Sequence, residues 1–96
     1  MISIDLINYN PIKKWRPMHG DMLHFNGWFT RWIGVVAGAS GNSLKVIRAG
    51  TVAELCNYGS KAQEKNTINL DVEEILSSNA KYSVNRVENN VSIWYL

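Results

Sequence analysis

The sequence predicts a single, mainly β domain. Its 96 residues carry enough apolar surface for one core. Short runs of alternating apolar and polar residues are separated by glycine and asparagine, which is typical of antiparallel strands joined by turns. Only one stretch carries the capping residues of a helix, and strands do not alternate with long helices, so a parallel α/β sheet is excluded.

The N-terminal segment combines a strand pattern with an extended arm. The run ISIDLIN (2–8) alternates apolar and polar residues, which predicts a strand with one buried face. The following NPIKKWRPMHG (10–20) contains Pro11 and Pro17, which disfavour both a helix and a central strand. We therefore divide the chain into residues 1–19, a strand and an extended arm, and residues 20–96, a small β-barrel.

The central segment is predicted to hold most of the strands. The runs GDMLHFN (20–26) and RWIGVVAG (31–38) have strand character and are joined by the aromatic loop NGWFT (26–30). A turn at Gly41 and Asn42 leads into LKVIRAG (44–50), so residues 31–49 predict a hairpin. TVAELC (51–56) is interpreted as a further short strand, and the polar residues 56–66 as an exposed loop.

The last third of the chain predicts one helix and one hairpin. Asp71 and Glu74 have the spacing of a capping box, which begins a short helix over 71–78 that Asn79 can end. Asn89 and Asn90 tolerate the positive φ angles of a type I′ turn, which predicts a C-terminal hairpin. The final strand is apolar on both faces and must be covered by this chain or by a partner.

The predicted architecture is a small barrel of five to seven short antiparallel strands with one short helix and an extended N-terminal arm. Strand and helix phases assign eight side chains to its core: Leu23, Phe25, Ile33, Val35, Leu44, Val46, Ile75 and Val84.

Residues 20–55 resemble the barrel core of the NlpC/P60 hydrolases in the sequence GDMLHF, then GVVAG, then LKVIRAG. The spacing of the glycines is similar to that of SH3-like barrels in general. The compact size, asparagine-rich turns and extended arm are also similar to small accessory proteins of tailed phages. The resemblance places the hydrolase histidine at Trp32, which cannot transfer a proton, and no cysteine lies upstream of it. It therefore implies the fold without the catalytic residues.

Catalytic and metal chemistry find little support in the sequence. The single cysteine, Cys56, has no evident base and excludes both a disulfide framework and a multi-cysteine zinc site. His19 and His24 are five residues apart on an extended segment, so they are predicted to face opposite sides. We expect no enzyme activity, no metal site and no cofactor.

Aromatic and basic residues are the candidates for binding. Trp, Tyr and Arg dominate the energetics of protein interfaces, whereas interleaved rings and cations also suit single-stranded nucleic acid. Trp32, inside a strand, is expected to pack in the core. The predicted protein-binding residues are Trp15, Arg16, Trp28, Phe29, Arg31 and Trp94. The residues predicted for the nucleic-acid alternative are Lys13, Lys14, Arg31 and Arg48.

The leading hypothesis is a non-catalytic protein-binding or assembly module, in the form of a structural or accessory component of a phage particle. Its partners would be other copies of the chain or another protein of the same assembly. A nucleic-acid-binding barrel and a small inhibitor of a host protein are the alternatives. No apolar run reaches the roughly 20 residues of a membrane span. We expect a soluble protein that is intracellular at synthesis, in the host cytoplasm or later in a virion, with no membrane partner.

Overall fold

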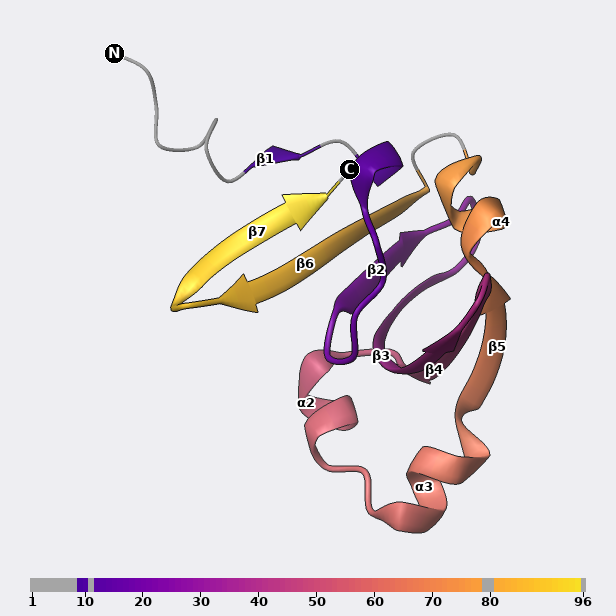
Figure 1. Ribbon diagram of the computed structural model, residues 1–96. Coiled ribbons are helices and arrows are strands. Elements are labelled where there is room, and N and C mark those ends of the chain that lie inside the picture. Colours follow the sequence, from indigo (N-terminus) through magenta and orange to yellow (C-terminus); the bar gives the residue numbers. More distant parts are fainter. Residues whose placement is uncertain (1–8, 11, 79–80, 96) are drawn as a thin grey trace.

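The computed structural model describes residues 9–10, 12–78 and 81–95. These residues form one mixed but mainly antiparallel sheet of seven strands, with three short α-helices and one 3-10 helix (Figure 1). The elements in chain order are β1 (Tyr9–Asn10), η1 (Ile12–Lys14), β2 (Met22–Asn26), β3 (Arg31–Ser40), β4 (Ser43–Ala49), α2 (Val52–Cys56), α3 (Ser60–Lys65), β5 (Thr67–Asp71), α4 (Val72–Leu76), β6 (Tyr82–Glu88) and β7 (Val91–Tyr95).

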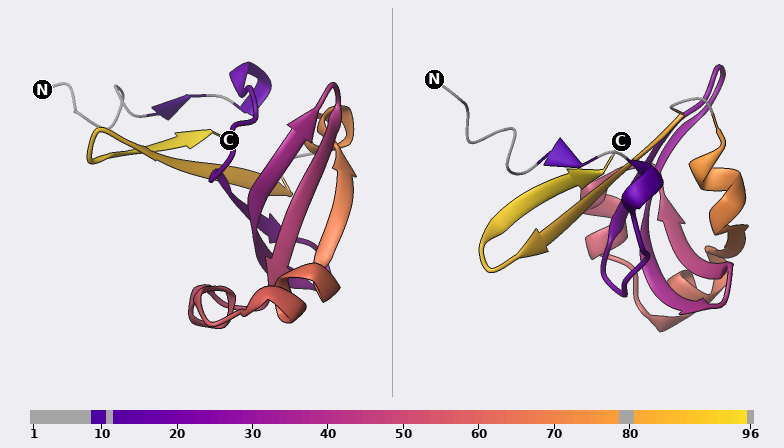
Figure 2. Two further views of the ribbon diagram at one scale, coloured as in Figure 1. Left: turned by 60° about the horizontal axis from the view of Figure 1, so that its bottom comes forward. Right: turned by 45° about the horizontal axis from the view of Figure 1, so that its top comes forward.

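The sheet is curved and open. Its strand order is β1-β7-β6-β2-β3-β4-β5, and every neighbouring pair is antiparallel except β1 with β7. Within the described residues β1 and β5 do not pair, so the mainly β class is confirmed but a closed barrel is not. Figure 2 shows the turn end of the β6–β7 hairpin projecting away from β2 to β5, while β1 lies beside β7. The predicted strand over residues 2–8 lies outside the described residues.

Both predicted hairpins are present. The β3–β4 turn lies at Gly41 and Asn42, and Gly41 has a φ of +60°. The β6–β7 turn has positive φ at both central residues, 52° at Asn89 and 66° at Asn90, as a type I′ turn requires. Local turn chemistry was therefore sufficient to locate these two connections.

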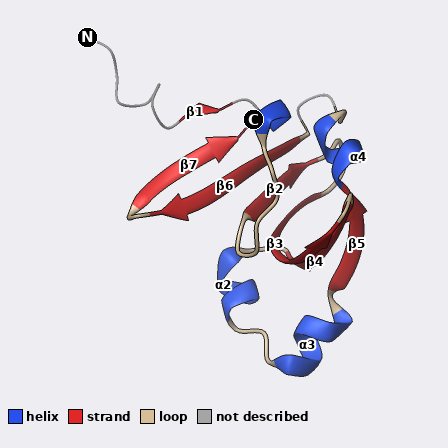
Figure 3. Cartoon of the chain, viewed as in Figure 1, coloured by secondary structure: helices blue, strands red, loops and turns tan. Residues whose placement is uncertain are grey.

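The segment between β4 and β5 was predicted wrongly. The predicted strand over 51–56 is instead helix α2 (Val52–Cys56) with its N-cap, because the Thr51 hydroxyl oxygen accepts a hydrogen bond from the Glu54 N–H at 3.1 Å and caps the helix. The presumed loop contains α3, and a further strand, β5, follows it (Figure 3). Neither α2 nor α3 buries a residue, so no apolar period was available to reveal them.

The core lies between the inner face of the curved sheet, α4 and the segment around η1. Leu23, Leu44, Val46, Ile75 and Val84 are buried as predicted. Further buried residues of this core are Trp15, Val36 and Val72.

The predicted phase of β3 was wrong by one residue. Gly34 and Val36 face the core, whereas Ile33 and Val35 are half-buried on the opposite, outer face. A Cβ at Gly34 would lie 2.5 Å from Cγ1 of Val46, so only glycine lets β3 and β4 pack at this point. The run WIGVVAG is apolar on both faces, and alternation could not decide between them. Phe25 is half-buried within an aromatic cluster on the inner face.

Helix α4 begins where the sequence predicts. The Asp71 carboxylate accepts a hydrogen bond from the Glu73 N–H at 2.9 Å, and Val72 and Ile75 pack into the core. The C-cap is Ser77. The predicted cap, Asn79, lies outside the described residues.

Candidate functional site

The loop between β2 and β3 presents two aromatic rings to solvent. The Gly27 N–H donates to the Thr30 carbonyl at 2.8 Å, which closes a tight four-residue connection. A Cβ at Gly27 would lie 2.7 Å from the Phe25 ring, so glycine is needed for the turn to approach that ring. Trp28 is 85% exposed and Phe29 is 96% exposed. Large apolar side chains are seldom left this exposed without a partner, so we treat the aromatic loop, residues 26–30, as the candidate site.

A packed aromatic cluster lies beneath the aromatic loop. Phe25 stacks on Trp32 with ring centroids 5.3 Å apart, and Tyr82 packs 4.9 Å from Phe25 and 6.0 Å from Trp32. The Arg48 guanidinium lies 5.6 Å from the Trp32 ring centre. Burial raises the pKa of Tyr82, and the charge of Glu74 raises it further while that of Arg48 lowers it. Trp32 therefore packs against the core, as its place within a strand indicated.

A hollow of about 460 Å³ lies beside this cluster, lined by Phe25, Glu74, Ser77, Ser78, Lys81 and Tyr82. Its lining includes two aromatic rings, one carboxylate and one ammonium group. Because Phe25 lines the hollow and also lies beside Gly27, the hollow adjoins the base of the aromatic loop.

The other predicted protein-binding residues lie elsewhere. Arg31 is exposed and begins β3, next to the aromatic loop. Trp94 is 39% exposed on β7, where it packs on His24 with ring centroids 5.2 Å apart. Burial lowers the pKa of His24. The strand registers place Trp94 on the outer face of the sheet and level with the start of β2, so it does not join the aromatic loop at the other end of that strand.

Trp15 corrects an expectation drawn from the sequence. We expected it to contact another surface, but its side chain is only 3% exposed and its indole N–H donates to Asp21 Oδ2 at 2.8 Å. Arg16 is exposed, while its backbone carbonyl accepts a hydrogen bond from Arg86. The arm is held against the sheet by these contacts, so the Trp15 ring is not available to a partner.

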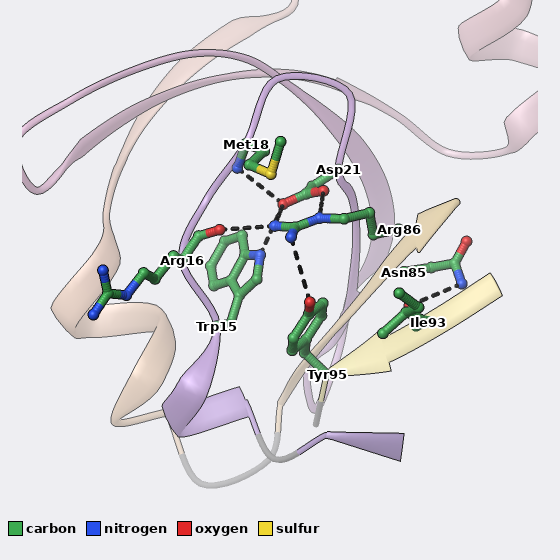
Figure 4. A network of polar contacts seen from close by, with 8 residues as sticks. All are labelled: Trp15, Arg16, Met18, Asp21, Asn85, Arg86, Ile93 and Tyr95. Carbon is green, nitrogen blue, oxygen red and sulfur yellow. Dashed lines mark hydrogen bonds and ion pairs between the residues drawn. The ribbon is translucent and has the colours of Figure 1, made fainter. Parts of the chain in front are cut away.

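The ion pair between the buried Asp21 and the partly buried Arg86 organises that contact (Figure 4). Arg86 Nε and Nη2 each lie 2.7 Å from an oxygen of the Asp21 carboxylate, a bidentate arrangement. Asp21 Oδ2 also accepts from the Met18 N–H at 3.0 Å, and Arg86 Nη1 donates to the Tyr95 hydroxyl at 3.3 Å. The bonds to Asp21 raise the pKa of Arg86 despite the opposing effect of burial.

This network was missed from the sequence. One sign was available, because Arg86 shares the inward face of its strand with Tyr82 and Val84, where a charge needs a buried partner. Each oxygen of Asp21 is engaged, and the groups that hold it come from this chain. We therefore interpret the network as structural.

The residues proposed for nucleic acid do not form one surface. Lys14 is on η1, Arg31 begins β3, and Arg48 is the penultimate residue of β4. Strand alternation places Arg31 on the outer face, whereas Arg48 lies on the inner face over Trp32. The side chain of Lys13 is not among those that the structure describes.

Reactive groups are sparse in the described part of the chain. Cys56 is exposed at the end of α2. No group of three or more His, Cys, Asp or Glu side chains there has the geometry to hold a metal ion. Among the described helices, none has both the length and the apolar character needed to cross a membrane.

Comparison of the chain with family models, with curated proteins and with solved structures finds no match.

Proposed function

We propose that the protein is a non-catalytic binding module that anchors itself to a partner protein through Trp28 and Phe29. The observation that carries this proposal is the exposure of both rings on a short loop that the Gly27–Thr30 hydrogen bond closes. Trp and Arg are the residues most enriched in the energetic centres of interfaces, and Arg31 lies two residues after Phe29.

The contacts at the base of the aromatic loop favour this role. The Gly27–Thr30 hydrogen bond closes the loop, and the rings of Phe25, Trp32 and Tyr82 pack against one another at its base. A preorganised anchor loses little conformational entropy when it binds. The adjoining hollow adds a recess with one positive and one negative group, which suits a protein surface that carries a projecting side chain and mixed charge.

The proposal includes an SH3-like framework and a place in an assembly such as a phage particle. Its support is the curved antiparallel arrangement of β2 to β5 and the small size of the chain. A small inhibitor of a host protein would use the same anchor residues. The identity of the partner would distinguish this inhibitor role from the assembly role. The nucleic-acid alternative has less support, because its described cations lie on three elements and on both faces of the sheet.

The experiment begins with cross-linking of the wild-type chain and the Trp28→Ala variant in the particles or cells that contain the protein, followed by mass spectrometry of the cross-linked products. The partner that only the wild type retains is then purified, and its affinity is measured by calorimetry. We expect Trp28→Ala to weaken binding by about 2 kcal/mol or more, which is about thirtyfold.

Two controls make the result decisive. Lys45→Ala removes an exposed side chain on β4, away from the aromatic loop, and should leave the affinity unchanged. A titration with single-stranded DNA at two salt concentrations tests the alternative, which requires affinity that falls steeply with salt. Equal partner affinities for the wild type and Trp28→Ala would contradict the proposal.

A further inference from the structure

Strand β5 forms an open edge of the sheet. It pairs with β4 and has no strand on its other side among the described residues (Figure 1). Backbone bonds from the Arg48 N–H to the Asn66 carbonyl, at 3.0 Å, and from the Val72 N–H to the Asn42 carbonyl, at 2.8 Å, bracket the pairing. Bonded and non-bonded pairs alternate along an antiparallel ladder. The register therefore directs the N–H and C=O groups of Thr67, Asn69 and Asp71 away from β4.

The side chains of β5 suit the addition of a strand. Ile68 and Leu70 are half-buried and pack against the core, whereas Thr67, Asn69 and Asp71 are exposed. Edge strands are commonly protected by a proline, a lysine or a bulge. The strand TINLD contains neither proline nor lysine, and its pairing with β4 has no bulge.

Opposite charges flank the two ends of this edge. Lys65 ends α3 two residues before Thr67, and Glu73 follows Asp71 by two residues in α4. Both are exposed, and within the described residues neither forms an ion pair. Lys65 and Glu73 are each four residues from Asn69 in the sequence, so a positive charge flanks one end of the edge and a negative charge flanks the other.

We propose that the partner at this edge is a second copy of the chain, whose β5 pairs antiparallel with β5 about a two-fold axis at Asn69. In this register Thr67 lies opposite Asp71 of the second copy, and Ile68 lies opposite its Leu70. Asn69 meets its own equivalent. No like charges meet, and the outward N–H and C=O groups of Asn69 pair with those of its equivalent.

The same two-fold axis matches the flanking charges. It places Lys65 of each copy at the end of the interface where Glu73 of the other copy lies, so two equivalent contacts of opposite charge form. A shift of the register by two residues in either direction shortens the ladder and separates these charges. A strand from an unrelated protein could use the same backbone groups, but the second copy supplies both complementary charges by symmetry.

This inference rests on the assembly role proposed above and names one of its partners. The surface does not include Trp28 or Phe29, so the two proposals can fail separately.

Sedimentation of the full chain over a range of concentrations measures the dimer directly. We expect a concentration-dependent monomer–dimer equilibrium. Asn69→Pro removes an N–H that points outward, so it blocks the added strand without removing a bond to β4. It should raise the dissociation constant by about tenfold or more, because the two ladder bonds that the Asn69 residues exchange at the two-fold axis are both lost. Asn69→Ala keeps the N–H and is the matched control, with a dissociation constant close to that of the wild type.

Charge reversal tests the register. Lys65→Glu alone and Glu73→Lys alone each bring like charges together twice in the dimer, and each should weaken it several-fold to about tenfold. The double variant Lys65→Glu/Glu73→Lys restores opposite charges and should recover the wild-type dissociation constant. Circular dichroism confirms that each variant is folded.

Three results would overturn the inference: a wild-type chain that stays monomeric up to about 1 mM, a dimer unaffected by Asn69→Pro, or a double charge variant no better than the single variants. A dimer that is lost in Trp28→Ala but kept in Asn69→Pro would also overturn it, while leaving the aromatic loop as the assembly contact.

Discussion

Trp15 and Trp28 have similar neighbours in the sequence but lie in opposite environments, one buried and the other exposed. Each lies outside the regular strands, each has a cation within three residues, and each is near a residue that breaks regular structure, Pro17 or Gly27. Trp15 is 3% exposed and Trp28 is 85% exposed. Neighbouring residues therefore do not determine which ring is buried.

The difference lies in what the rest of the chain offers to the indole group. Trp15 enters the core because Asp21 accepts a hydrogen bond from its N–H, and Arg86, from a strand distant in sequence, balances the carboxylate charge. Trp28 has no hydrogen bond or ring contact within the described residues, because the turn at Gly27 directs it outward. A buried tryptophan needs both space and an acceptor, and only Trp15 has them.

The largest expected effect is a difference in the free energy of unfolding between variants at these two residues. Trp15→Ala should lower the free energy of unfolding by about 3 to 5 kcal/mol, because it leaves a cavity and removes a bond from Asp21. Trp28→Ala should change it by no more than about 0.5 kcal/mol, because the side chain has few contacts to lose. Urea denaturation of the two variants measures both, and equal losses would contradict the contrast.

Breaking the pair beneath Trp15 should have an effect of similar or slightly smaller size. Asp21→Ala leaves the partly buried Arg86 without its counter-charge and should cost about 3 kcal/mol or more. Arg86→Ala should cost about as much, and the double variant less than the sum of the two, since both remove the same pair. Chemical denaturation of all three chains gives the coupling energy, and strict additivity would show that the pair is not a unit.

A smaller contrast tests the phase of β3. Val36→Ala removes buried methyl groups and should cost about 2 kcal/mol, whereas Val35→Ala, on the half-buried outer face, should cost less than about 1 kcal/mol. Thermal and urea unfolding of this matched pair distinguishes the two faces. A larger loss for Val35→Ala would support the phase predicted from the sequence.

The smallest expected effect is the pH dependence of stability that His24 causes. Its pKa in the folded chain is lowered from 6.5 by burial, so protonation favours the unfolded chain. The contribution of this residue to stability should therefore fall as the pH drops below 6.5 and become constant below the lowered folded-state pKa. His24→Gln should reduce this decline between pH 7 and 5, as measured by urea unfolding at each pH. A decline of the same size in both chains would assign it to other groups.

Local patterns were sufficient for the mainly β class, both hairpin turns and the start of α4. Asn89–Asn90 and Gly41 define turns because these residue types tolerate the positive φ angles that the turns need. Asp71 defines the start of α4 because its side chain bonds a backbone N–H only two residues further along the chain. The sequence also indicated Trp28 and Phe29 as outward-facing rings, because glycine and the turn are adjacent to them.

Long-range contacts decided the rest. The face of β3 that is buried depends on Val46 packing against Gly34, since the strand is apolar on both sides. The burial of Trp15 depends on Arg86, which is 65 residues from Asp21 in the sequence. Whether the sheet closes depends on β1 and β5, which are strands at the two edges of the sheet. Sequence patterns report the preferences of a segment, but burial and pairing are properties of surfaces that exist only after distant segments meet.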